Sequence, residues 1–321
     1  YQVRTDVADE RLRQVMTRID AVYRSLGHEF RGLDARVREH RNVLLFEKRS
    51  DFRHILLREF GVNAGETGGL FFRSPRGVAL AVAVEGLSDR QLAHVVQHEA
   101  AHQFAESRFG DDLPRWIAEG LSELCAHGIV LNGTLHLGLR PPGPVNALRQ
   151  AAEADRLVPA TRLATWSAEA WAEAAADPEL AVVYDQAWSL VHFLMYGRDG
   201  AHRAAFQRYL ALLHEGYLDD YAFNEAFGPD QRDDLDAAWR ASLADLTPDP
   251  FAVAVDRIDF LAAGQLHLHR RGLRPTTFED LCVALREANF QRGGALHRRD
   301  ADETLDCEAL ATLPRRHDED D

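Results

Sequence analysis

The segment QLAHVVQHEAAHQFAESRFG, residues 91–110, decides how this chain is expected to fold. It contains the pentapeptide His98-Glu99-Ala100-Ala101-His102, an HExxH motif, among apolar residues with helical spacing. A capping-box pair, Ser88 and Gln91, precedes the segment, and a glycine closes it. We therefore expect one long helix from about Ser88 to Phe109.

The spacing of the two histidines predicts a metal site. Residues four apart lie one above the other on a helix, so His98 and His102 can reach the same cation. Zinc binds imidazole nitrogen at about 2.0–2.1 Å and prefers four ligands, so a third protein ligand leaves one position for water. Glu99 is rotated about 100° from His98 and can flank that water as a general base. The pattern predicts one zinc ion.

The segment LPRWIAEGLSEL, residues 113–124, supplies the expected third ligand. Its apolar spacing predicts a second helix, from near Pro114 to about His127. Glu119 lies beside the apolar stripe, where a carboxylate is costly unless a cation or a partner compensates for it. Gly120 has no side chain and would let another helix approach closely. We expect Glu119 to complete the zinc site.

Two neighbouring residues leave alternatives open. Glu123 follows Glu119 by one turn and could accept the free N–H of a zinc-binding histidine, although a solvated surface position is an equally good interpretation. His94 precedes His98 by one turn and is a rival ligand. The pair of His98 and His102 is preferred, because the alternative pair would put Val95 where the base should be.

The segment YDQAWSLVHFL, residues 184–194, offers two donors for a developing oxyanion. Tyr184 stands at the start of the expected helix, where its side chain can project into a cleft, and His192 lies two turns later. A half-buried core aromatic is an equally good interpretation of Tyr184, and a structural role is the preferred interpretation of His192. Further histidines occur in alternating stretches and are expected to be surface or strand residues: His136, His267 and His269.

The rest of the chain predicts an α+β fold. Before the HExxH segment we expect a helix at Asp9–Leu26, a strand at Asn42–Glu47, a helix at Asp51–Phe60, and a hairpin of Leu70–Arg73 with Val78–Val84. After residue 128 we expect a hairpin at Ile129–Leu137 and helices at 145–156, 167–176, 182–196, 202–214 and 233–245. Thr247–Pro250 is interpreted as a linker, and beyond it only Phe278–Phe290 has a clear helical pattern. These elements suggest three parts: 1–128, 129–246, and an accessory segment, 247–321.

Composition excludes several classes of function. The 321 residues carry a formal net charge of −14, which argues against nucleic-acid binding through a basic surface. The longest apolar run, Val78–Val84, is far shorter than the about 20 residues of a membrane span. Cys125, Cys282 and Cys307 form no CxxC pair, so they are expected to be small buried groups. Few cysteines favour the cytoplasm, and export with a removed leader stays open because the chain begins at Tyr1.

HEAAH followed by LPRWIAEGLSEL resembles the gluzincins, the zinc metallopeptidases that include thermolysin and the aminopeptidases. Over about residues 10–246 the chain resembles more closely an uncharacterised bacterial branch of peptidase-like domains, which share the strand NVLLFEKRSDF, the hairpin before HExxH, the WxxEG motif and a later Tyr-x-x-x-Trp helix. The resemblance implies a zincin-like fold, in which a small sheet packs on the HExxH helix above a mainly helical lower part. It also implies zinc bound by His98, His102 and Glu119, with Glu99 as the base.

The resemblance further implies that the strand Val78–Val84 borders the cleft and pairs with an extended peptide substrate. No counterpart of the aminopeptidase motif GxMEN is present, so aminopeptidase specificity is not expected. Two other functions stay open: a zincin-like binding module without turnover, and a metallohydrolase that does not cleave peptides. The sequence leaves the oligomeric state open.

Overall fold

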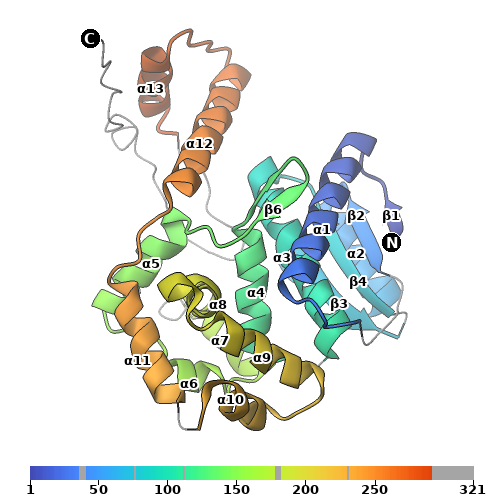
Figure 1. Ribbon diagram of the computed structural model, residues 1–321. Coiled ribbons are helices and arrows are strands. Elements are labelled where there is room, and N and C mark those ends of the chain that lie inside the picture. Colours follow the sequence, from blue (N-terminus) through green and yellow to red (C-terminus); the bar gives the residue numbers. More distant parts are fainter. Residues whose placement is uncertain (36–40, 76, 111–112, 178–181, 230, 291–321) are drawn as a thin grey trace, which may run out of the picture. The chain divides into compact units, whose positions relative to one another are not determined.

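The computed structural model describes residues 1–35, 41–75, 77–110, 113–177, 182–229 and 231–290 (Figure 1). Cys307 and the end of the accessory segment lie outside these residues. The chain divides into two compact units, Tyr1–Pro248 and Asp249–Asp321. The first unit is a mixture of helices and a small sheet, as the predicted α+β class requires. The predicted division of this unit at residue 128 stays a prediction.

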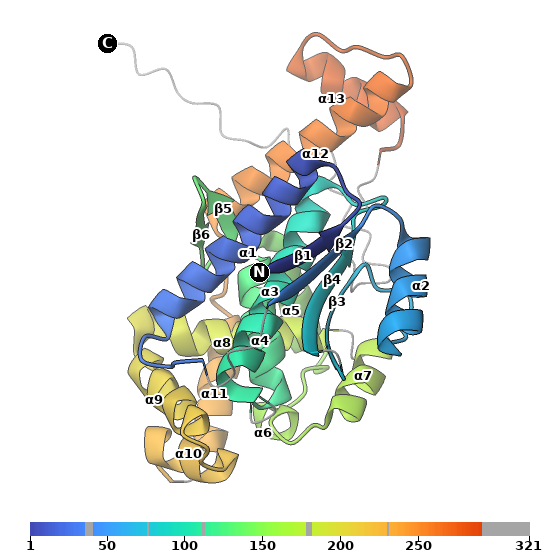
Figure 2. The ribbon, with the colours of Figure 1, turned by 90° about the vertical axis from the view of Figure 1, so that its right-hand side faces the viewer.

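A four-stranded sheet forms one side of the first unit, with the strand order β1-β2-β4-β3. Strands β1 (Gln2–Thr5), β2 (Asn42–Phe46) and β4 (Gly77–Ala83) are parallel, whereas β3 (Gly69–Ser74) is antiparallel to β4. Helix α2 (Arg49–Phe60) covers one face and α3 (Asp89–Phe109) the other (Figure 2). The sheet therefore gives α3 a rigid support on one side.

The expectation that the strand before the HExxH helix pairs with a peptide is wrong. That strand, β4, is hydrogen-bonded to β2 on one side and to β3 on the other, so both of its edges are already used. The free edge on this side of the sheet belongs to β3 instead. The hairpin itself was predicted, but strand order depends on long-range pairing with β2, which the local pattern does not contain.

The helix that carries HExxH forms as predicted. The Ser88 hydroxyl accepts a hydrogen bond from the Gln91 N–H, and the Gln91 side chain accepts one from the Ser88 N–H at 2.9 Å, which completes the capping box. The helix ends at Gly110, which has a positive φ of 60°. These local contacts fix both ends of α3 within one residue of the prediction.

Helix α4 (Arg115–Ala126) lies between α3 and α8 (Val183–Tyr196). A Cβ atom at Gly120 would lie only 2.4 Å from the Ala187 carbonyl oxygen and 2.5 Å from Val191 Cγ2. The predicted close approach of two helices at Gly120 is therefore confirmed, and the partner is α8. This packing holds α4 against α3 from the opposite side.

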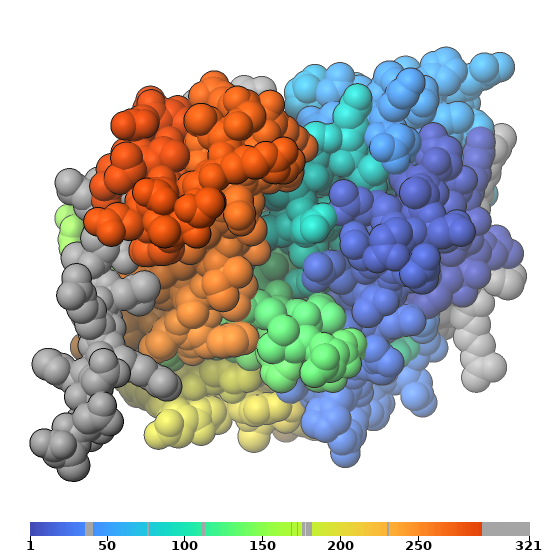
Figure 3. Space-filling view, turned by 90° about the horizontal axis from the view of Figure 1, so that it is seen from above, coloured from blue at the N-terminus to red at the C-terminus, as the bar shows by residue number. Residues whose placement is uncertain are grey.

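The remaining elements of the first unit complete its helical half. They are α1 (Asp9–Glu29), β5 (Ile129–Leu131), β6 (Thr134–His136), α5 (Pro142–Glu153), α6 (Ala160–Leu163), α7 (Ala168–Ala176), η2 (Gly197–Gly200), α9 (Arg203–His214), α10 (Asp219–Phe227) and α11 (Arg232–Leu243). The β5–β6 hairpin lies beside α1 (Figure 3), where Arg24 donates to the Gly133 carbonyl oxygen at 2.8 Å. His136 is exposed on β6, as predicted. In the described part of the chain, no helix combines the length and the apolar character needed to cross a membrane.

The division between the two units, at Pro248 and Asp249, falls within the predicted linker Thr247–Pro250. Helix α12 (Pro250–Arg270), which the sequence analysis did not predict, follows directly, and Asp249 caps it by accepting a hydrogen bond from the Phe251 N–H at 2.9 Å. Proline is tolerated in the first turn of a helix, so Pro250 can be the first residue of α12. Phe260 and Leu268 pack against Leu285 of α13 (Phe278–Glu287). His267 and His269 lie in the last turn of α12, not in a strand, and His269 is exposed, which agrees with the expected surface position.

Candidate metal centre

Helices α3 and α4 bring together three of the predicted site residues. His98 Nε2 lies 3.0 Å from His102 Nε2, and Glu119 Oε2 lies 3.5 Å and 3.4 Å from these two nitrogens. Ligand atoms at tetrahedral corners around zinc are about 3.4 Å apart when the bonds are about 2.1 Å long. The three donor atoms form a triangle of this size, so the group could hold a metal ion.

His98 and Glu119 are buried, so their charged forms are stable only when an opposite charge lies next to them. Glu119 is 1% exposed, and its Oε2 makes no hydrogen bond within the described residues. Burial alone would raise the pKa of Glu119, but His102 and His98 lower it well below the usual value. Burial likewise would lower the pKa of His98, but Glu119 and Glu123 raise it well above 6.5. A cation between these groups would satisfy the buried oxygen and both nitrogens at once.

Arg115 holds the other half of the Glu119 carboxylate. Its Nη2 lies 2.7 Å from Glu119 Oε1, while Oε2 faces the two histidines. The carboxylate is therefore presented to the candidate metal through one oxygen. Sequence reasoning missed Arg115, although its spacing of four residues from Glu119 places both on one helix face.

Replacing Arg115 by glutamine is expected to weaken the binding of an added divalent metal ion at this group by about 10–100-fold, because residues that orient a metal ligand typically have effects of this size. Competition with a chromophoric chelator measures the affinity. Arg115→Lys should have a smaller effect, since it keeps the charge but not the planar geometry of the guanidinium. The exposed Arg149 on α5 provides a matched control, Arg149→Gln. Equal affinities of Arg115→Gln and wild type would contradict this role.

Glu99 lies beside the cluster, between α3 and the edge of the sheet. It is 5% exposed, and its Oε2 accepts a hydrogen bond from the Phe71 N–H of β3 at 2.7 Å. Its charge contributes to raising the pKa of His98. A Cβ atom at Gly69 would lie 3.3 Å from Glu99 Cγ and 2.2 Å from Val95 Cγ1, so a glycine is needed where β3 crosses α3.

Glu123 forms a second layer behind His98. It is 4% exposed, so its interpretation as a solvated surface residue is wrong. Its Oε1 lies 3.1 Å from His98 Nδ1, the contact that would fix the orientation of a zinc-binding imidazole. Its Oε2 lies 3.7 Å from His94 Nε2 and 3.3 Å from His127 Nε2. Burial by itself raises the pKa of Glu123, but the histidines around it lower the value more.

The two predicted oxyanion donors lie in different surroundings. Burial raises the pKa of Tyr184, and the charge of Glu119 raises it further, so the hydroxyl lies within the electrostatic reach of the cluster. Its ring stands edge-on to Trp171, with centroids 5.6 Å apart. His192 Nε2 instead lies 3.1 Å from the Gly138 carbonyl oxygen, to which it can donate, and its ring packs between Trp188 and Tyr196. These contacts agree with the structural interpretation of His192 that the sequence favoured.

The buried position of His192 predicts a specific pH dependence of stability. Burial lowers the pKa of His192 to about 4, whereas an unfolded histidine titrates near 6.5. Between these values the unfolded state binds a proton that the native state does not, so the free energy of unfolding falls as the pH falls. Wild type should lose about 2 kcal/mol more than His192→Gln between pH 7 and pH 5 in urea denaturation. Equal losses would contradict the assignment, and His136→Gln serves as the exposed control.

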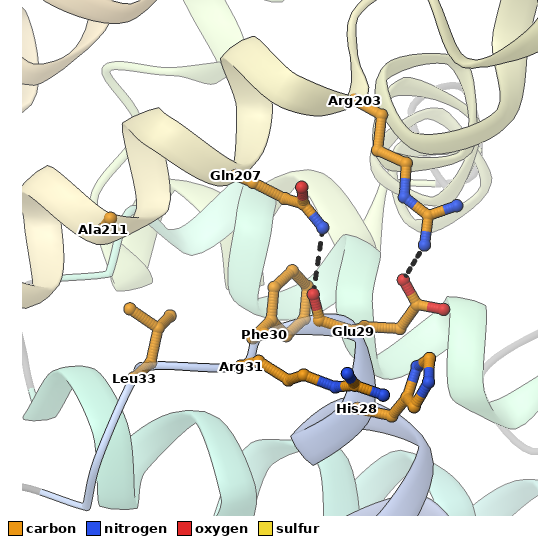
Figure 4. A pocket seen from close by; sticks show the side chains of 8 residues that line it. All are labelled: His28, Glu29, Phe30, Arg31, Leu33, Arg203, Gln207 and Ala211. Atoms are coloured by element: carbon orange, nitrogen blue, oxygen red, sulfur yellow. Dashed lines mark hydrogen bonds and ion pairs between the residues drawn. The ribbon is translucent and has the colours of Figure 1, made fainter.

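A pocket of about 510 Å³ lies elsewhere in this unit, between the end of α1 and α9 (Figure 4). Its polar side chains are largely paired, since Glu29 forms an ion pair with Arg203, and Gln207 donates to the Glu29 carbonyl oxygen at 3.0 Å. None of its lining residues belongs to the His and Glu clusters. Among the described residues, the groups that could hold a metal ion therefore lie on α3 and α4, away from this pocket.

Comparison with known protein families gives a match over the region that contains the His and Glu clusters. Residues 92–212 match a family model described as a protein of unknown function, DUF1570. This range contains His94 and every residue of the candidate metal centre, together with Tyr184. No curated protein matches the chain. The region that is shared with other proteins is thus the part that holds the His and Glu clusters.

Proposed function

We propose that this protein is a zinc-dependent peptidase with a zincin-like fold and a gluzincin-type centre. The main observation that supports this proposal is the triangle of donor atoms formed by His98 Nε2, His102 Nε2 and the buried Glu119 Oε2, whose sides are 3.0, 3.4 and 3.5 Å long. Two imidazoles and one carboxylate suit zinc, and three protein ligands leave a position for water, as in catalytic rather than structural zinc sites.

The residues around this position have complementary roles. When bound, zinc would polarise the scissile carbonyl and acidify a water molecule. The Glu99 carboxylate takes a proton from that water as its oxygen attacks the carbonyl carbon, and later returns the proton to the leaving amine. The Tyr184 hydroxyl donates a hydrogen bond to the oxyanion. Glu123 keeps the His98 ring in place through Nδ1.

The free edge of β3 suits an extended peptide substrate. Phe71 of β3 is paired with Leu80 of β4, and its N–H donates to Glu99 Oε2 at 2.7 Å. This edge therefore faces the proposed base. A peptide added along β3 would bring its backbone past Glu99 and the metal centre.

Chelation tests this proposal directly. The purified protein is expected to contain zinc and to cleave a mixed peptide library, with cleavage abolished by a chelator and restored by added zinc. Bound zinc without chelator-sensitive cleavage of any peptide would instead favour a binding module. Chelator-sensitive hydrolysis confined to esters or other non-peptide substrates would favour a different metallohydrolase. Either result overturns the proposal.

A further inference from the structure

The imidazole of His98 has a carboxylate next to each of its two ring nitrogens. Glu119 Oε2 lies 3.5 Å from Nε2, and Glu123 Oε1 lies 3.1 Å from Nδ1. All three side chains are buried. The two acids are four residues apart on α4 and so lie one turn apart on the same face of that helix. The ring of His98 therefore links two buried acids through opposite nitrogens.

Each of these acids belongs to a group of three residues that could hold a metal ion. The first group is the candidate metal centre, and the second consists of His94, His98 and Glu123. In the second group the donor atoms, one from each residue, all lie within 4.8 Å of one another, and His94 Nε2 lies 3.7 Å from Glu123 Oε2. Donors that share one zinc-like ion through bonds of about 2.1 Å lie at most about 4.2 Å apart. Small movements of these side chains are therefore enough to enclose an ion.

We propose that His94, His98 and Glu123 form a second position for a divalent cation of the zinc class, and that an ion occupies either this position or the first centre, not both. Two imidazoles and one carboxylate select such ions over calcium or magnesium, which prefer oxygen ligands. The exclusion follows from His98, which both groups share. A neutral imidazole has one N–H and one nitrogen with an available lone pair, so it binds a metal ion through one nitrogen only.

Glu119 and Glu123 exchange roles between the two positions. When His98 binds an ion of the first centre through Nε2, its Nδ1–H faces Glu123 Oε1 at 3.1 Å. When His98 binds an ion of the second position through Nδ1, its Nε2–H faces Glu119 Oε2 at 3.5 Å. In both cases one acid is a ligand and the other faces the remaining N–H, which is the usual arrangement around a metal-binding histidine. Both tautomers of His98 are thus provided for by buried acids.

The first centre should be the preferred position. Its donor atoms lie 3.0–3.5 Å apart, whereas Glu123 Oε2 lies 3.7 Å from His94 Nε2 and is also 3.3 Å from His127 Nε2. Side chains of the second group must move further to enclose an ion, and this movement reduces the net affinity. An ion in the second position takes the lone pair of His98 from the first centre, so this position is inactive in the proposed hydrolysis. The inference requires metal binding and does not depend on peptidase activity.

Removing the first centre should reveal the second position. The full chain, freed of metal, is dialysed against a series of buffered free-zinc concentrations, and bound zinc is measured by elemental analysis. Wild type should bind one ion. His102→Ala should still bind one ion, at least about tenfold more weakly, because the better-fitting position is lost. Glu119→Gln/His102→Ala should match His102→Ala, since a glutamine amide oxygen can still accept from His98.

A second substitution at His94 should then abolish this binding. His94→Ala/His102→Ala should bind zinc at least about tenfold more weakly than His102→Ala, since the loss of a direct ligand costs no less than the loss of a residue behind one. His136→Ala/His102→Ala, with its second change at an exposed position of β6, is the matched control and should bind as His102→Ala does. Far-UV circular dichroism identifies any loss of fold. His94→Phe, which keeps a ring but has no nitrogen, replaces His94→Ala if that variant unfolds.

Three results would overturn the second position. His102→Ala could bind no zinc at any concentration, or His94→Ala/His102→Ala could bind it as tightly as His102→Ala. Wild type could also bind two ions, of which His94→Ala removes one, and the two positions would then not be exclusive. One zinc ion in wild type without chelator-sensitive cleavage contradicts only the proposed function. Chelator-sensitive cleavage by wild type, with no zinc in His102→Ala, contradicts only the second position.

Discussion

Replacing Glu99 by glutamine is expected to lower the proposed peptide hydrolysis by about 10²–10⁴-fold, the usual contribution of a general base, while the proposed zinc ion remains bound. Glutamine has nearly the same shape, and its amide oxygen can still accept a hydrogen bond from the Phe71 N–H, as Glu99 does. The fold and the three zinc ligands should therefore be unaffected. Cleavage rates of a peptide found in the library screen, together with zinc content, measure the two effects separately.

The exposed Glu225 on α10 supplies a matched control, since Glu225→Gln makes the same chemical change far from the cluster in sequence. This control should keep wild-type activity. If Glu99→Gln kept its rate while holding one zinc ion, Glu99 would not be the base. If it lost zinc as well as activity, the carboxylate would instead be needed to build the metal centre.

Replacing Gly120 by alanine is expected to lower the free energy of unfolding by about 3 kcal/mol, because an added methyl group in a tightly packed contact forces backbone shifts. The new Cβ would lie 2.4 Å from the Ala187 carbonyl oxygen, a backbone atom that cannot rotate away. Helices α4 and α8 would have to separate, and Glu119 is the next residue. Zinc affinity should therefore fall together with stability. Urea denaturation and chelator competition measure the two quantities.

Replacing Gly27 by alanine is expected to stabilise the protein, and this variant serves as the control for Gly120→Ala. Gly27 lies within α1, and a Cβ atom there would meet nothing within 4 Å. Gly27→Ala should raise the free energy of unfolding by about 0.5–1 kcal/mol, since alanine loses less conformational entropy in a helix. A stabilising effect at Gly120 as well would mean that the α4–α8 contact is looser than the structure describes.

The HExxH helix could be predicted from the sequence almost to the residue, because its determinants are local. The capping box at Ser88, the apolar period and Gly110 act within a few residues of each other, so the pattern contains the physical cause. The spacing of His98 and His102 likewise follows from helix geometry alone. Glu119 could be predicted as a metal ligand from a general rule: a carboxylate beside an apolar stripe needs a cation or a hydrogen-bonding partner.

Other features depended on contacts between distant segments, and only the tertiary structure decided them. The pairing of β4 with β2 made β3 the free edge, and the packing of α8 on Gly120 fixed α4 against α3. Helix α12 was not predicted, and its buried residues Phe260 and Leu268 pack against Leu285 of α13, a contact that the local pattern does not contain.

The sequence by itself therefore determined the chemical inventory of the site: two imidazoles one turn apart, a base beside them and a carboxylate on the next helix. Only the fold decided which atoms converge, including Arg115 on Glu119 Oε1 and the cluster of His94 and His127 on Glu123. The reason is that a helix fixes the spacing of its own side chains through local hydrogen bonds. The face that meets another helix is instead set by the packing of the whole core.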